Sequence, residues 1–160
     1  MAAADYVIGL AQSDTMQVQL AGDGLSNTGP NPFSASGNII TVQNSSGVFS
    51  NVTPTLPNGN FGISFVPPKL GTMQVCYTDY LSSSIANPQL YITIQDGMGN
   101  NYGAVQSGPT GSFSSCFLVQ ITQAQLSGAM NFVLYAWEQN SNTVYLDSAQ
   151  YNIWTISYVK

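Results

Sequence analysis

Polar and apolar residues alternate along nearly the whole of this chain, and turn-forming residues interrupt the alternation at short intervals. A period of two places successive side chains on opposite faces of a β-strand. Met73, Val75 and Tyr77 follow this pattern, and so do Leu90 and Ile92. Short strands that recur between turns are typical of a sandwich or barrel. The sequence therefore predicts an all-β fold, an antiparallel β-sandwich or jelly roll of about 8 to 10 strands with at most one short helix.

The strand patterns run from one end of the chain to the other without a visible domain boundary. A chain of 160 residues fits one domain, which can bury roughly 70% of its unfolded surface. We therefore expect residues 1–160 to form a single jelly-roll domain, with its last strand in the middle of a sheet. The expected strands lie at 6–10, 15–20, 39–43, 47–53, 61–65, 73–78, 90–95, 113–121, 130–138, 143–147 and 151–159, with a hairpin end at 96–103 that leads into a further strand.

Two segments depart from the strand pattern. Residues 22–38 are rich in Gly, Pro, Ser and Asn, which predicts a long loop, and long loops in compact domains often carry function. Thr122 and Gln125 match a capping box, and Gly128 can end a helix after about one turn. This segment is the one helical candidate.

The chain is nearly free of cations, because it contains two lysines, Lys69 and Lys160, no arginine and no histidine. A nucleic-acid-binding surface neutralises several phosphates, commonly about six to ten, and two lysines cannot supply these contacts. An anionic membrane surface would repel a chain whose net charge is −5, and no stretch is long and apolar enough to span a membrane. The sequence therefore predicts no nucleic-acid partner and no direct membrane insertion.

Without histidine, a Ser/His/Asp or Cys/His catalytic device is excluded, since a serine needs a base beside it to become a nucleophile. Paired carboxylates can hydrolyse a glycoside, and Asp79, Asp96, Glu138 and Asp147 are the acids available for that chemistry. Acids at strand ends are more commonly solvated surface groups. We therefore expect a protein that is not an enzyme.

Cys76 and Cys116 are the only cysteines, and both lie in strand-like runs. They have neither the CxxC spacing nor the histidine neighbours of a zinc site. Two buried free thiols are the expected state of a chain without a secretion signal. The alternative is a disulfide, which would stabilise the fold by roughly 4 kcal/mol in the chain-entropy picture.

Two further groups of residues suit ligands. Asp96, Asn100 and Asn101 offer oxygen atoms in a glycine-rich hairpin, which suits a calcium ion, although an ordinary turn explains the same residues. Amphipathic aromatic rings can stack on sugars, and Trp137 and Tyr102 are the candidate glycan-binding residues. An aromatic side chain in a strand more often fills a core or a subunit interface. We expect no cofactor and no obligatory metal.

About ten strands, the Gly/Pro/Asn-rich loop at 22–38, one short helix and almost no charge together resemble a viral single jelly-roll structural protein. The likeness is architectural and covers the whole chain. Jelly-roll capsid proteins that package RNA directly carry a basic N-terminal arm, and this chain has no such arm and no arginine. It is therefore more similar to the capsid proteins of icosahedral bacteriophages whose shell encloses a membrane.

The resemblance implies a virion structural protein, a capsid subunit that self-assembles as a homo-oligomer and contacts other virion proteins without binding the genome. It also implies a location in the virion after synthesis in the host cytoplasm, because the chain's start lacks the basic residue of a signal peptide and carries Asp5. Two alternatives remain open. One is a trimeric receptor-binding head of the tumour-necrosis-factor or complement-C1q type on a phage spike or tail fibre, and the other is a carbohydrate-binding module.

Overall fold

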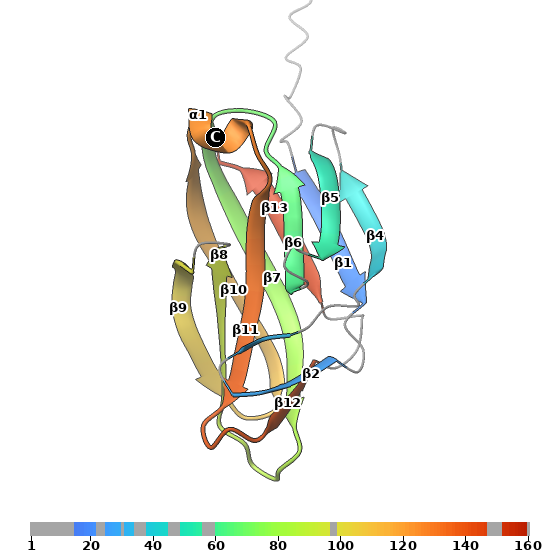
Figure 1. Cartoon of the computed structure of the whole chain (residues 1–160), viewed down its shortest axis with the longest axis vertical. Helices are drawn as coiled ribbons and strands as arrows, with labels where there is room; N and C mark the ends of the chain where they lie inside the picture. The colour runs from blue at the N-terminus through green and yellow to red at the C-terminus, as the bar shows by residue number, and fades with distance from the viewer. Residues whose placement is uncertain are drawn as a thin grey trace, which may run out of the picture.

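A computed structural model describes residues 15–21, 25–29, 31–33, 38–44, 49–55, 60–96, 99–146 and 152–159. Two antiparallel β-sheets stack face to face, and the short helix α1 (Gln123–Leu126) lies at one end of this sandwich (Figure 1). Sheet A comprises β1 (Thr15–Ala21), β2 (Leu25–Thr28), β4 (Asn38–Asn44), β7 (Gly71–Ser83), β10 (Gly111–Ile121), β12 (Thr143–Leu146) and β13 (Ile153–Tyr158). Sheet B comprises β3 (Asn31–Pro32), β5 (Ser50–Thr55), β6 (Phe61–Val66), β8 (Leu90–Asp96), β9 (Asn101–Gly108) and β11 (Met130–Glu138).

The strand order confirms the all-β jelly-roll prediction and the central position of the last strand. In sheet A, β13 lies between β7 and β1, and β10 pairs with the other edge of β7. In sheet B, β11 is flanked by β8 on one side and by β6 and β3 on the other. Most neighbours are distant in sequence, so the fold depends on long-range pairing rather than on local hairpins.

The prediction of one long loop at 22–38 is wrong. Within that segment, β2 pairs with β12 and β3 pairs with β11, so the chain contributes a short strand to each sheet. The amide of Asn27 donates to the carbonyl of Ala136, which ties β2 to the opposite sheet. Gly and Pro content concealed these strands, because pairing with distant partners outweighs weak local β-propensity. The strand expected at 6–10 lies outside the described residues.

The interior follows the alternation in the sequence. On β7, Met73, Val75 and Tyr77 point inward and are buried, while the residues between them face outward. Trp154, Phe61 and other large side chains fill the space between the sheets with at most 1% of their surface exposed. Burial of each such side chain contributes about 1.5–3 kcal/mol, so this layer supplies most of the folding free energy.

Helix α1 begins where the sequence predicts. The backbone N–H of Thr122 donates to the side-chain carbonyl of Gln125 at 2.8 Å, which completes the capping box. The helix ends after one turn at Ser127, next to Gly128. None of its residues is fully buried, and it closes the connection between β10 and β11 with Leu126 packed against the edge of the core.

Asp79 is a buried acid in the largely apolar interior. Its position on β7 is an inward-facing one, only 1% of its surface is exposed, and neither carboxylate oxygen has a hydrogen-bond partner. Burial raises the pKa of Asp79 to about 8, because a low-dielectric interior disfavours the charged form. Burial, followed by the nearby Asp79 charge, also raises the pKa of Tyr77. The expectation that the acids are solvated strand-end groups is therefore wrong for Asp79.

We predict that Asp79 makes the protein less stable as the pH rises. Between the ordinary pKa of 3.8 and the folded-state pKa of about 8, the folded chain keeps a proton that the unfolded chain loses. The free energy of unfolding therefore falls with rising pH across this window, by up to about 1.4 kcal/mol per pH unit for this group, and levels off above it. Asp79→Asn removes this contribution.

Urea unfolding of the wild type and of Asp79→Asn at several pH values between about 5 and 8 measures the effect. The difference in unfolding free energy should shift in favour of the variant as the pH rises. Two curves that stay parallel over this window would show that Asp79 is solvated in the folded protein.

Candidate functional site

The outer face of sheet A is a broad surface built by four adjacent strands. Because β10, β7, β13 and β1 pair in register, Cys116, Cys76, Thr155 and Gln17 lie directly opposite one another in a row across the sheet. Equivalent rows lie above and below it. Each outward residue alternates with a buried one, so the hydrophobic period in the sequence determines which side chains form this surface.

The outward positions of these four strands carry no charged residue. Short polar side chains predominate, and Leu118 is the most exposed large apolar side chain among the described residues, with 61% of its surface accessible. The absence of lysine and glutamate is a feature that this surface shares with the buried cores of interfaces, in which charged residues are depleted. The outward set is Thr15, Gln17, Gln19, Thr72, Gln74, Cys76, Thr78, Tyr80, Ser112, Ser114, Cys116, Leu118, Gln120, Ile153, Thr155 and Ser157.

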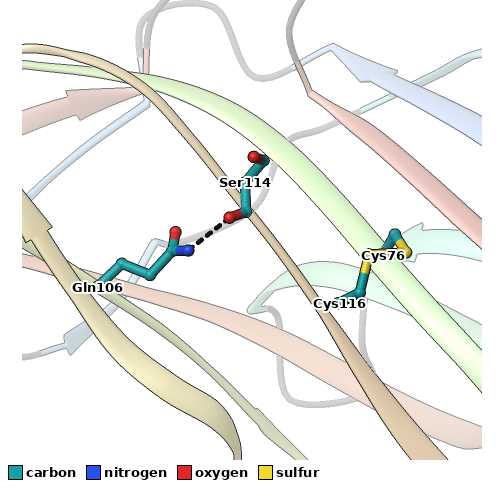
Figure 2. The surroundings of a disulfide bond; sticks show 4 residues. All are labelled: Cys76, Gln106, Ser114 and Cys116. Carbon is teal, nitrogen blue, oxygen red and sulfur yellow. Dashed lines mark hydrogen bonds between the residues drawn. A yellow bond between two sulfur atoms is a disulfide. The ribbon is translucent and has the colours of Figure 1, made fainter.

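A disulfide between Cys76 and Cys116 crosses from β7 to β10 in the middle of this face (Figure 2). The two Cα atoms are 4.1 Å apart, and Cys116 is exposed. The expectation of two buried free thiols is therefore wrong on both counts. The register of β7 against β10 places the two cysteines opposite each other, and spacing along the sequence contains no information about that register.

A second surface lies on the outer face of sheet B, where aromatic side chains gather. Tyr91 and Trp137 are cross-strand neighbours on β8 and β11, and their rings stack at 5.3 Å between centroids with 13° between planes. Tyr135 and Thr93 form the next pair along the same face. All three aromatic side chains are half-buried. This aromatic patch, defined as Tyr91, Tyr135 and Trp137, has rings beside neutral hydrogen-bonding groups.

The structure does not bring Trp137 and Tyr102 together. Tyr102 pairs with Ile94, an inward-facing residue of β8, and its ring packs against Phe117 and Phe132 at 5.1 and 5.5 Å between centroids. Tyr102 therefore lies on the core side of sheet B, whereas Trp137 lies on the outer side. Tyr91 is the partner of Trp137, and sequence reasoning missed it because the pairing register was unknown.

The hairpin that joins β8 to β9 directs hydrogen-bond donors at the Asp96 carboxylate. The backbone N–H of Asn100 donates to Oδ1 at 2.9 Å, while its side-chain amide and the Tyr102 hydroxyl donate to Oδ2 at 2.8 and 3.2 Å. The Asn101 oxygen instead accepts from Gln95 at 2.9 Å. Calcium requires such oxygens to converge on one point, and here they are engaged separately. Burial, followed by the Asp96 charge, raises the pKa of Tyr102.

Glu138 is held in a turn. Its carboxylate is buried and accepts hydrogen bonds from the backbone N–H of Asn140 at 2.7 Å and from the side-chain amide of Asn142 at 2.8 Å. Burial alone would raise the pKa of Glu138, and the bonds from Asn142 and Asn140 outweigh that effect and lower it. The expectation of a solvated acid is wrong here too. Asp147 lies outside the described residues.

No cluster of side chains that could hold a metal ion occurs in the part of the chain that the structure describes. Three or more His, Cys, Asp or Glu side chains do not gather anywhere among these residues. An open depression of about 660 Å³ lies where β9 turns into β10, and residues 106–114 that line it include no ionisable side chain. None of the described helices is long and apolar enough to cross a membrane.

Comparison with known proteins gives similarity at the level of the fold. No protein-family model matches the chain, and no curated protein matches it. Among solved structures, murine APRIL has a TM-score of 0.51 at 7% identity, covering 92% of this chain and 100% of that one. The PRD1 vertex protein P5 has a TM-score of 0.49 at 14% identity and covers 92% and 97%. The CBM22-1 xylan-binding domain of Paenibacillus barcinonensis Xyn10C has a TM-score of 0.36 at 15% identity and covers 88% and 98%. The likeness to murine APRIL supports the jelly-roll fold and nothing finer.

We predict that the disulfide stabilises the fold substantially. It joins residues 40 positions apart, and closing a loop of this length stabilises a fold by roughly 4 kcal/mol in the chain-entropy picture. Replacement of both cysteines by serine should lower the free energy of unfolding by about 2–4 kcal/mol, measured by urea unfolding. The reduced wild type should match the double variant. A double variant as stable as the oxidised wild type would contradict the prediction.

Proposed function

We propose that this chain is a virion structural protein, a jelly-roll capsid subunit that self-assembles into a shell without catalysis and without binding the genome. The observation that carries the proposal is the uncharged outer face of sheet A. A chain with a net charge of −5 can meet another copy of itself there without opposing like charges. Of the seven acids, Asp79 and Glu138 are buried and Asp96 is engaged in its hairpin.

Assembly through this face would be driven by apolar burial and by hydrogen bonds between neutral groups. Such an interface depends weakly on salt, because it contains no ion pairs to screen. A shell that does not contact the genome needs no basic groove, and the two lysines of the chain agree with that role. Other virion proteins would be the additional partners. The same face could instead form a trimeric receptor-binding head, which the stoichiometry of the assembly would reveal.

A glycan-binding role is the second candidate, and the stacked Tyr91–Trp137 pair favours it. Aromatic rings present flat apolar faces to the C–H groups of a sugar, and neutral polar neighbours can bond to its hydroxyl groups. The aromatic patch lies on sheet B, so glycan binding and assembly through sheet A would use opposite faces of the sandwich.

We predict that one charge on the outer face of sheet A abolishes self-association through that face. Gln17 is exposed on β1, and Gln17→Glu adds a negative charge with almost no change in shape. Placing that charge in an interface between copies would leave it buried and unpaired, which costs several kcal/mol. Light scattering across concentration and salt should give a salt-insensitive oligomer for the wild type and a species of lower mass for Gln17→Glu.

Gln123→Glu is the matched control. It makes the same chemical change at an exposed position in helix α1, away from the outer face, and should leave the oligomer intact. Equal masses for Gln17→Glu and the wild type, or a strong loss of association in high salt, would count against the proposal. A strict trimer would favour the receptor-binding head.

For the second candidate, Trp137→Ala should weaken binding on a glycan array by about fivefold or more while the far-ultraviolet circular dichroism stays unchanged. Loss of one sugar-stacking ring removes about 1 kcal/mol or more of interaction. Tyr80→Ala, which removes an aromatic ring from the outer face of sheet A, is the control and should bind like the wild type. A wild type that binds no glycan on the array would eliminate this candidate.

A further inference from the structure

Strand β10 forms an edge of sheet A. It pairs with β7 along all eleven of its residues, from Gly111 to Ile121, without a bulge or shift in register. No strand of the described chain pairs with its other side. A long regular edge of this kind presents unpaired backbone groups in an order that another strand can match.

The disulfide identifies which backbone groups face the open side. Directly opposite residues in an antiparallel pair are about 4.5 Å apart where they do not exchange hydrogen bonds and about 5.5 Å apart where they do. Cys76 and Cys116 are 4.1 Å apart, so they form a pair that exchanges none. The N–H and C=O of Cys116 therefore point away from β7, and those of Ser114, Leu118 and Gln120 do the same because the pattern repeats every second residue.

One contact agrees with this assignment independently. The side-chain amide of Gln106, on β9, donates to the carbonyl oxygen of Ser114 from the open side of β10 (Figure 2). Beyond Ser114, β10 makes no backbone hydrogen bond outside its ladder with β7 among the described residues. Cys116, Leu118 and Gln120 thus present a continuous row of donors and acceptors to solvent.

The devices that normally protect such an edge are missing from β10. Its sequence, GSFSSCFLVQI, contains no charged residue and no proline, and its register with β7 has no bulge. Charged residues, prolines and bulges are the features that keep natural sheets from pairing edge to edge. Leu118 is highly exposed on the same strand, and the disulfide fixes the strand against β7. A fixed edge loses little conformational entropy when it binds.

The geometry points to a second copy of this chain as the partner of the edge: the two β10 strands pair antiparallel about a two-fold axis, so that sheet A continues from one copy into the other. In such a pair each exposed N–H meets a carbonyl of the other copy, and the reverse contact follows by symmetry. Electrostatics favour the same partner, because two uncharged edges bring no charge into the interface. A charged peptide would find no counter-charge on β10 and would leave its own charges unpaired.

This interface is distinct from the outer face used in the proposed function. It extends sheet A in its own plane, whereas assembly through the face adds a layer on top of the sheet. The two proposals therefore rest on different contacts, and one can fail while the other stands.

Amide hydrogen exchange at two protein concentrations tests the edge directly. The amides of Cys116, Leu118 and Gln120 should exchange at least about tenfold more slowly in the concentrated sample, because pairing buries their N–H groups. The amides of the intervening residues bond to β7 and should be protected equally at both concentrations. Absence of this alternation, or a wild type that stays monomeric at every concentration, would overturn the inference.

Leu118→Pro is the decisive variant. Proline lacks the N–H that points to the open side, and its loss leaves the ladder with β7 complete. Leu118→Thr is the matched control, since it removes the apolar side chain and keeps the N–H. Sedimentation velocity should show loss of the two-fold pair in Leu118→Pro and its retention in Leu118→Thr and Gln17→Glu.

The other possible results also distinguish the edge interface from association through the outer face. If Leu118→Pro associates like the wild type, the edge is not an interface and the inference fails. If only Gln17→Glu dissociates, the outer face carries all the association, and the proposed function stands without the edge. Should Leu118→Pro fail to fold, the alternating exchange pattern of the wild type still shows whether the edge pairs.

Discussion

The eleven-residue register between β7 and β10 is the constraint on which the rest of this structure depends. It decides which residues of both strands enter the core, since a slip by one position would turn every side chain to the other face. It also aligns Cys76 with Cys116, so that one covalent bond fixes the register that made it possible. The same alignment leaves the alternate N–H and C=O groups of β10 directed to the open edge. Core, disulfide and edge are therefore three consequences of one pairing.

The core itself contains a conflict. Between Tyr77 and Leu81, β7 places Asp79 where the sandwich is otherwise apolar, and the carboxylate finds no donor there. A neutral acid costs far less to bury than a carboxylate, so the fold holds Asp79 in its protonated form over much of the ordinary pH range. Glu138 shows the opposite solution, because its turn supplies N–H donors that stabilise the charge. Two buried acids in one chain thus differ in protonation because one has hydrogen-bond donors and the other has none.

The sequence predicts the features of this structure that depend on neighbouring residues, and it does not predict those that depend on pairing between distant segments. Alternation is local, so it predicted the β-sandwich, the buried face of β7 and the capping box at Thr122. Partner choice is not local: the short strands inside 22–38, the stacking of Tyr91 on Trp137 and the cysteine pair all depend on which distant strands lie side by side. The proposed glycan residues illustrate the limit. Trp137 and Tyr102 are both aromatic residues in strand-like segments, so the sequence does not distinguish them. The structure places them on opposite faces of sheet B.

The scarcity of charge connects the fold to its proposed role. Most soluble proteins protect sheet faces and sheet edges with lysine, glutamate or proline, and sheet A has such residues neither on the outward positions of β10, β7, β13 and β1 nor along the β10 edge. Association through the unprotected face would stack a second copy on top of sheet A, whereas association through the unprotected edge would extend sheet A in its own plane. A subunit with both can join more than one neighbour, which any assembly larger than a dimer requires. The missing charges are thus most simply explained if copies of the chain cover both surfaces for one another.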